Sequence, residues 1–168
     1  MTAAVVLLTL VTLGRLGELW LAQRNTAVLL KRGAVEHAAD HYPLIVALHA
    51  AWLATLWLYG AGQPLDPAWL TVFVGLQAAR AWVLITMGER WTTRILVVPG
   101  ERLVARGPYR FVSHPNYIVV TGEILVLPLC LGLSSVALLF SALNAVVLMI
   151  RVRAEDAALR QASRDAAA

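Results

Sequence analysis

Charged residues are scarce in this chain, and what is missing excludes several classes of protein. Of its 168 residues, 14% are charged and 60% are hydrophobic, against about 25% and about 45–50% in an ordinary soluble domain. Cysteine occurs once, at Cys130, so no internal disulfide and no cysteine-based metal site is expected. The sequence also has no G-x-G-x-x-G fingerprint, which argues against a Rossmann-type cofactor domain. The apolar excess indicates that a lipid bilayer is the solvent, and the length favours a single domain, residues 1–168.

Histidine is rare too, and its spacing argues against a metal centre. His37 and His41 are four residues apart, as in a metal-binding box, but a membrane di-metal oxygenase needs several such boxes. The other two histidines, His49 and His114, stand in none. We therefore expect no metal.

Five apolar runs approach the length of about 20 residues that a membrane-spanning helix needs. They cover residues 3–21, 42–59, 68–87, 117–131 and 135–150. The last two are short, and the turn at 132–134 joins them into a helical hairpin. An amphipathic helix follows at the C-terminus. The predicted fold is an all-α integral membrane protein with about five transmembrane helices.

Basic residues are distributed on one side of the predicted spans. The segments that follow the first, third and fifth spans carry nearly all of the 13 arginines and the one lysine. Because cytoplasmic loops are enriched in these residues, the N-terminus is predicted outside and the C-terminus inside. The arginine and alanine bias is typical of a GC-rich bacterial genome, so we expect the inner membrane. Anionic lipids explain the net charge of +4 more simply than a nucleic acid does.

The connection at residues 88–113 is the first candidate site, because unstructured connections longer than about 12–15 residues are usually functional or disordered. It runs into the segment RGPYRFVSHPNY at residues 106–117. Pro115 suits the first position of a helix, so His114 and free backbone amides would face an anionic ligand. Tyr109 and Tyr117 offer walls for a flat ring. The alternative is an interfacial loop with aromatic anchors.

Ionisable residues near or within the spans form the other candidates. Arg151 and Glu155 share one helical face beside the connection, although an exposed ion pair is the simpler interpretation. Charged groups inside a bilayer usually face the protein interior or a wet cavity. They would form structural pairs, such as Arg15–Glu18 or Arg80–Glu123, or line a substrate cavity. His49 and Glu123 are the candidates for lining the cavity.

The combination of motifs resembles the isoprenylcysteine carboxyl methyltransferase family. The resemblance rests on Glu101-Arg-Leu-Val104, Gly107-Pro-Tyr109, His114-Pro-Asn-Tyr117 and the distal Arg151-x-x-x-Glu155. Upstream segments are similar to a bacterial branch that is associated with O-methylation of polyketide lipids such as alkylpyrones. Ser113 departs from the pattern, because many members carry arginine there; its hydroxyl would serve as a helix cap.

The resemblance implies a membrane-embedded methyltransferase that uses S-adenosylmethionine bound on the cytoplasmic side, within residues 88–117 and 151–160. Arg151 would bind the substrate and act in catalysis together with Glu155. The implied cofactor contacts are Glu101, Arg102, Leu103, Val104, Tyr109, His114, Pro115, Asn116, Tyr117 and Glu155.

The acceptor implied by the bacterial branch is a lipophilic molecule that enters sideways from the bilayer, with a long-chain alkylpyrone as the favoured example. A prenylcysteine carboxyl group is the alternative acceptor. Two other classes remain open at this point. They are a membrane reductase of related fold, which would need a nicotinamide nucleotide, and a transporter without enzymatic activity.

Overall fold

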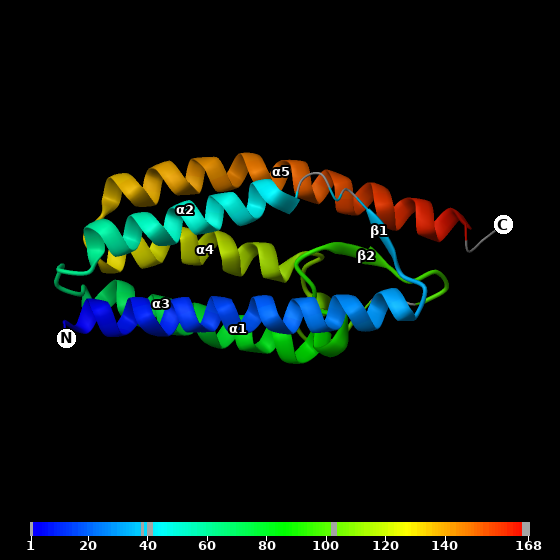
Figure 1. Cartoon of the computed structure of the whole chain (residues 1–168), viewed down its shortest axis with the longest axis horizontal. Helices are drawn as coiled ribbons and strands as arrows, with labels where there is room; N and C mark the ends of the chain where they lie inside the picture. Colours follow the sequence, from blue (N-terminus) through cyan, green and yellow to red (C-terminus); the bar gives the residue numbers. More distant parts are fainter. Residues whose placement is uncertain (1, 38, 40–41, 102–103, 166–168) are drawn as a thin grey trace.

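The α-helices of the described residues lie along the long axis of the molecule and form a bundle (Figure 1). The structure is a computed structural model that describes residues 2–37, 39, 42–101 and 104–165, with side chains described up to residue 160. The helices are α1 (Ala3–Lys31), α2 (Tyr42–Gly60), α3 (Pro67–Met87), α4 (Pro115–Cys130) and α5 (Ser134–Asp165). The α2–α3 and α4–α5 turns lie at one end of the bundle, and the long 88–114 connection lies at the other.

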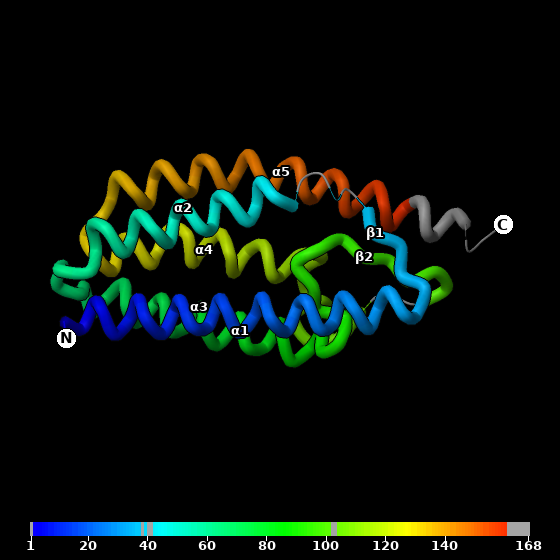
Figure 2. The backbone as a smooth tube through the Cα atoms, viewed as in Figure 1, coloured from blue at the N-terminus to red at the C-terminus, as the bar shows by residue number. Residues whose placement is uncertain are grey.

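A small sheet at the second end departs from the all-α prediction. Strand β1 (Val35–His37) pairs antiparallel with β2 (Ile95–Val97), and Val35 lies opposite Val97. Two short 3₁₀ helices, η2 (Gly88–Arg90) and η3 (Gly107–Arg110), flank β2 in the connection. Figure 2 shows this connection folding back over the end of the bundle instead of extending away from it.

Four helices, α1, α2, α3 and α5, are long and apolar enough to cross a membrane, whereas α4 has 16 residues. At 1.5 Å per residue α4 is about 24 Å long, less than the roughly 30 Å of a hydrocarbon core. The predicted hairpin of the last two helices is present, with Gly132 at φ +69° in the turn. The residues predicted as a C-terminal amphipathic helix are helical, and they continue α5 without a break, as residues 151–165 of that helix.

The ends of α3 and α4 follow from local sequence. Asp66 caps α3, since its carboxylate accepts from the amides of Ala68 (2.8 Å) and Trp69 (3.2 Å). Proline begins each of these helices, and Pro115 begins α4 as predicted. The N-cap of α4 is His114, and no side chain caps this helix end. The cap predicted at Ser113 is therefore wrong.

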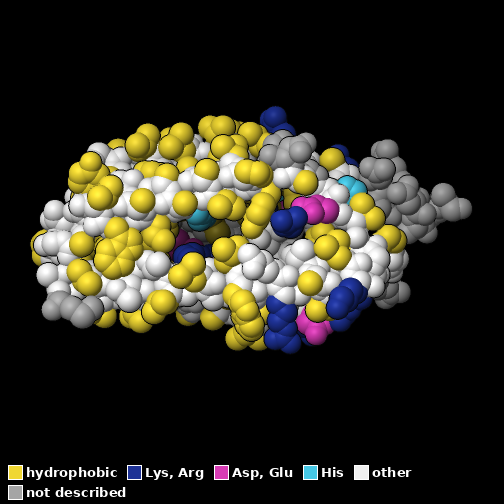
Figure 3. Space-filling model, viewed as in Figure 1, with side chains coloured by type: hydrophobic (Ala, Val, Ile, Leu, Met, Phe, Trp, Pro, Cys, Tyr) yellow, Lys and Arg dark blue, Asp and Glu magenta, His cyan; other side chains and the backbone are white. Residues whose placement is uncertain are grey.

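The apolar side chains divide into an interior set and an outward set. Leu8, Trp52, Leu56 and Leu127 are at most 2% exposed and belong to one contiguous core between the helices. Many large hydrophobic side chains are also exposed and lie along the helices on the face shown in Figure 3, whereas the basic side chains on that face gather mainly at the end with β1 and β2. An apolar outer surface of this extent fits a bilayer and not water.

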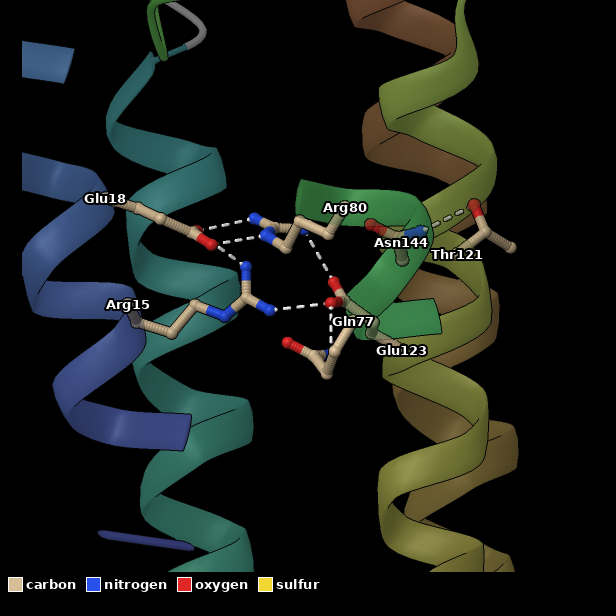
Figure 4. Close-up of polar contacts among 7 residues, drawn as sticks. All are labelled: Arg15, Glu18, Gln77, Arg80, Thr121, Glu123 and Asn144. Carbon is tan, nitrogen blue, oxygen red and sulfur yellow. Dashed lines mark hydrogen bonds and ion pairs between the residues drawn. The ribbon is translucent and has the colours of Figure 1, made fainter. Parts of the chain in front are cut away.

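Inside the bundle, four charged side chains close a ring that joins α1, α3 and α4 (Figure 4). Arg80 bonds Glu18 through Nε (2.5 Å) and Nη2 (2.7 Å), and it bonds Glu123 through Nη1 (2.7 Å). Arg15 completes the ring, at 2.8 Å from Glu18 and 2.9 Å from Glu123. Gln77 donates a further hydrogen bond to Glu123 (2.7 Å). The predicted pairs Arg15–Glu18 and Arg80–Glu123 are both present. The two arginines and two glutamates of the ring together carry no net formal charge.

Removing one member of this ring is predicted to destabilise the bundle strongly. In Glu123→Ala two arginines face a single carboxylate away from bulk water, and breaking a buried ion pair costs about 3–5 kcal/mol. The melting temperature of the purified protein in detergent measures the loss. Glu89→Ala is the matched control, because Glu89 pairs with Arg32 at the exposed end of the bundle and its loss changes little. Equal melting temperatures for the two variants would contradict the prediction.

Candidate active site

A cavity of about 120 Å³ lies at the end of the bundle where the 88–114 connection folds back. One wall comes from this connection, and the others come from the start of α4 and the second half of α5. Six of the residues that the sequence singles out lie on it: Tyr109, His114, Asn116, Tyr117, Arg151 and Glu155.

The hydroxyl of Tyr117 connects the two charged residues from α5. Arg151 Nε donates to this hydroxyl (2.8 Å), and the hydroxyl donates to the Glu155 carboxylate. The Arg151 Nη2 group also donates to the carbonyl oxygen of Thr93 in the connection (2.8 Å). Both charged residues are therefore held inside the site by α4, in place of the exposed ion pair that was the simpler sequence interpretation.

His114 lies against Tyr117 and between two carboxylates. The two rings stack with centroids 5.2 Å apart and an interplanar angle of 17°. Nε2 is 3.3 Å from Asp156 Oδ1, and Nδ1 is 3.9 Å from Glu155 Oε2. Two of the first backbone amides of α4 cannot bind an anion. Pro115 has no amide hydrogen, and the amide of Tyr117 donates to the carbonyl oxygen of His114 (3.1 Å). The start of α4 therefore offers fewer free amides than the sequence suggests.

Tyr109 closes the side of the cavity nearest α3. Its ring packs with the buried Trp91 in a small apolar cluster that also includes Ala22 and Val83. Burial, reinforced by the negative charge of Glu155, raises the pKa of Tyr109 to about 12. The side chain is therefore a neutral phenol at physiological pH, and it serves as an apolar wall and hydrogen-bond donor, not as a base.

The connection is anchored by Asn25, which the sequence analysis missed. Its Nδ2 group donates to the carbonyl oxygens of Gly88 (3.1 Å) and Trp91 (2.8 Å), and the side chain is buried. The only sequence signal is an amide residue in the extension of α1 beyond the first predicted span. Thr93, which this anchor helps to position, was likewise missed, because its contact with Arg151 is made through its backbone carbonyl.

A second cavity of about 270 Å³ lies inside the bundle, and it is mainly apolar. Figure 3 shows a hollow between α1 and α2 in which basic, acidic and histidine side chains are visible, and Arg15, Glu18 and His49 line this cavity. The two cavities share part of their walls: Trp91, Thr92, Asn116, Tyr117 and Arg151. A polar cavity and a bilayer-facing cavity thus meet at Tyr117 and Arg151.

The remaining predicted residues fall outside the shared wall. Glu101 pairs with Arg90 (2.6 Å), which lines the polar cavity. Val104 and Pro115 are not among the described residues that line that cavity. His49 lines the apolar cavity, whereas Glu123 is 2% exposed and belongs to the ion-pair ring, which favours a structural role. Arg102, Leu103 and His41 lie outside the described residues.

Within residues 2–37, 39, 42–101 and 104–160, no group of three or more His, Cys, Asp or Glu side chains is placed to hold a metal ion.

Comparison with known proteins shows the family of the chain. Residues 69–161 match the isoprenylcysteine carboxyl methyltransferase (ICMT) family. This range includes Arg80 and Glu123 of the ion-pair ring and all the residues that line the polar cavity. A Bacillus subtilis (strain 168) protein, "Uncharacterized protein YpbQ", is 39% identical over 162 residues, covering 94% of this chain and 96% of the relative. A Haemophilus influenzae "Uncharacterized protein" is 22% identical over 151 residues, covering 86% and 88%. No solved structure matches the chain.

The bundle, with four helices able to cross a membrane, defines an integral membrane protein. The chain belongs to the ICMT family and is a membrane methyltransferase.

The turn at Gly107 is predicted to require glycine for two separable reasons. Its φ is +58°, and an added Cβ would lie 2.4 Å from Thr86 Oγ1 on α3. Gly100→Ala tests the positive φ alone, because φ there is +78° in open space, and it should cost about 1–2 kcal/mol. Gly107→Ala should lower the melting temperature further and also displace Tyr109.

Adding Thr86→Ala to Gly107→Ala should recover the part of the loss that comes from the collision. A double variant as unstable as Gly107→Ala would show that the collision contributes nothing.

Proposed function

We propose that the protein is an S-adenosylmethionine-dependent O-methyltransferase whose acceptor is a lipophilic molecule from the bilayer. The observation that carries the proposal is the shared wall, because it brings a polar cavity and an apolar cavity to the same two side chains, Tyr117 and Arg151. A water-soluble methyl donor and a lipid-soluble acceptor need such a meeting point.

The residues of the polar cavity suit S-adenosylmethionine chemically. Arg90 and Arg94 place positive charge on the cavity wall, where the carboxylate of the cofactor would compete with their partners Glu101 and Glu36. Tyr109 and Trp91 offer aromatic surface for adenine, and the Glu155 carboxylate can accept from ribose hydroxyls. Asn116 Oδ1 is buried and has no partner among the described residues, so an acceptor is available for the cofactor's amino groups.

The polar cavity, at about 120 Å³, is smaller than the roughly 300–1,000 Å³ of typical ligand sites. Binding of the whole cofactor therefore requires the 88–114 connection to move outward. The pairing of β2 with β1, the apolar cluster around Trp91 and the hydrogen bonds from Asn25 and Arg151 hold the connection, so this movement would have to loosen some of these contacts.

When bound, S-adenosylmethionine would supply an electrophilic methyl group: the acceptor oxygen forms a bond to the methyl carbon, the sulfur–carbon bond breaks, and its electron pair stays on sulfur. The contribution of this chain is alignment and charge. Arg151 uses Nε and Nη2 for Tyr117 and Thr93, and Nη1 has no partner in the described part of the chain. Nη1 is thus available to hold an acceptor oxyanion, while Glu155 fixes Tyr117 from the other side. An acidic enol or carboxylate is already ionised at neutral pH, so no strong base is needed.

The acceptor that we favour is a long-chain polyketide such as an alkylpyrone, and a prenylcysteine carboxyl group is compatible with the same site. An ionisable oxygen would lie at Arg151 and the tail would leave through the apolar cavity between α1 and α2. The basic residues at the connection end support a cytoplasmic location for the polar cavity, in a bacterial inner membrane with the N-terminus outside.

Methyl transfer by the purified protein tests the proposal directly. The protein is incubated with methyl-labelled S-adenosylmethionine and either an alkylpyrone or a prenylcysteine analogue, and transfer to at least one is expected. No transfer to either, together with binding of a nicotinamide nucleotide, would favour the membrane reductase. Binding of neither S-adenosylmethionine nor a nicotinamide nucleotide would favour a transporter.

Replacing Arg151 is predicted to abolish most of this activity. Arg151→Gln should lower turnover roughly 100-fold or more, since it removes a charged donor from the acceptor oxygen. Arg153→Gln is the matched control, because it removes the same charge two residues along α5 from an exposed side chain and should leave turnover unchanged. Similar losses in both variants would argue for an effect of net charge.

Cofactor binding is predicted to slow amide hydrogen exchange in residues 91–97. All of these residues except Thr93 line the polar cavity, and the segment would close over the ligand. Exchange measured by mass spectrometry with and without S-adenosylmethionine should differ there, and residues 67–75 in α3 serve as the internal reference. Unchanged exchange in residues 91–97 at a saturating concentration would place the cofactor elsewhere.

A further inference from the structure

We propose that the apolar cavity contains a subsite for a second hydroxyl group on the head of the acceptor, formed by Trp52 and His49 of α2. The inference rests on the proposed function and narrows its substrate class to long-chain polyketides whose head group carries two hydroxyls, as a resorcinol does and a prenylcysteine or a singly hydroxylated pyrone does not. The acceptor would carry two oxygens on its head group: one is methylated beside Arg151, and the other is held by α2.

The first observation is an unpaired indole donor. Trp52 is 2% exposed and lines the cavity, and its Nε1–H has no hydrogen-bond partner among the described residues. Leaving a buried donor unsatisfied costs about 1–3 kcal/mol. Trp57, five residues further along α2, does not share this property, because its Nε1 donates to Thr12 Oγ1 (3.0 Å). The N–H of Trp52 is therefore available to a ligand.

The second observation is the orientation of His49. Its Nδ1 is 2.9 Å from the carbonyl oxygen of Ile45, and a carbonyl can only accept. In the neutral ring Nδ1 therefore carries the hydrogen, which leaves Nε2 as an acceptor. His49 and Trp52 are three residues apart on one helical face, and both line the cavity. A donor and an acceptor side by side match a hydroxyl group, which both accepts and donates.

The surrounding charges favour a neutral group over an anion. Arg15 and Arg80 also line the cavity, but their guanidinium groups are engaged by Glu18 and Glu123 within the neutral ring. A carboxylate at this subsite would have to compete with Glu18 and Glu123 for the two arginines. A hydroxyl needs only the donor of Trp52 and the acceptor of His49. The subsite therefore selects a hydroxyl over an anionic group by hydrogen bonding.

The position of the subsite also orients the acceptor. His49 lies on the α2 side of the hollow between α1 and α2, and Tyr117 and Arg151 lie at the wall shared with the polar cavity. A head group held at both places has a fixed orientation in the cavity. A ligand with a single oxygen has no such second contact and rotates freely.

Binding of two matched ligands tests the subsite without methyl transfer. The probes are an alkylresorcinol and the corresponding alkylphenol, which differ by one hydroxyl, and quenching of tryptophan fluorescence measures their dissociation constants on the purified full chain. The wild-type protein should bind the resorcinol roughly three- to tenfold more tightly, as one neutral hydrogen-bonded group implies. Equal binding of the two probes, or binding of neither, would overturn the subsite.

Two variants identify the groups responsible. Trp52→Phe removes the indole N–H and keeps an aromatic ring, and His49→Leu removes the acceptor; each should abolish the preference for the resorcinol. Trp57→Phe is the matched control, because it removes an indole N–H outside the cavity and should keep the preference. A preference that survives in either cavity variant refutes the assignment.

Failure of the subsite can be told apart from failure of the proposed function. Methyl transfer to an acceptor with no resorcinol preference leaves the function standing and removes the subsite. A clear preference that depends on Trp52 and His49, without methyl transfer to any acceptor, leaves the subsite standing and removes the function.

Discussion

The ring of Arg15, Glu18, Arg80 and Glu123 is the interaction on which the rest of the structure depends. Charges in a bilayer are tolerated only when they are paired and hydrogen-bonded, and here each carboxylate contacts two guanidinium groups. The ring can form only if α1, α3 and α4 are held at fixed positions relative to one another along the membrane normal. An apolar interface has no comparable register, because leucine and valine side chains pack against lipid nearly as well as against one another.

The depth of α4 in turn positions the chemistry. Glu123 anchors α4 less than two turns from Tyr117, so the start of this short helix lies within the bundle, beside the longer α5. The continuous course of α5 brings Arg151 and Glu155 to the same hydroxyl. The folded-back connection then adds Thr93 and Trp91, anchored by Asn25. A membrane methyltransferase thereby acquires a polar cavity and an apolar cavity with a common wall.

Much of the fold could be predicted because its signals are local. Apolar runs predict the membrane helices, Pro115 predicts where α4 begins, and the spacing of Arg15 and Glu18 predicts a pair on one face. The pairing of β1 with β2 could not be predicted, because three-residue strands carry too little pattern. The unbroken α5 was missed for a related reason: the change from apolar to charged sequence at Arg151 marks the change of solvent and not the end of the helix.

By itself the sequence determined the membrane character, the hairpin and a cluster of candidate residues near Tyr117 and Arg151, because hydropathy, proline and short spacings act within a few residues. It left open whether Arg151 and Glu155 form a surface ion pair or part of a site, and whether Glu123 and His49 share a role. Only the tertiary structure decided where these side chains lie. Glu123 is enclosed in the ring and His49 lines a cavity, since their surroundings come from helices that are far apart in the chain.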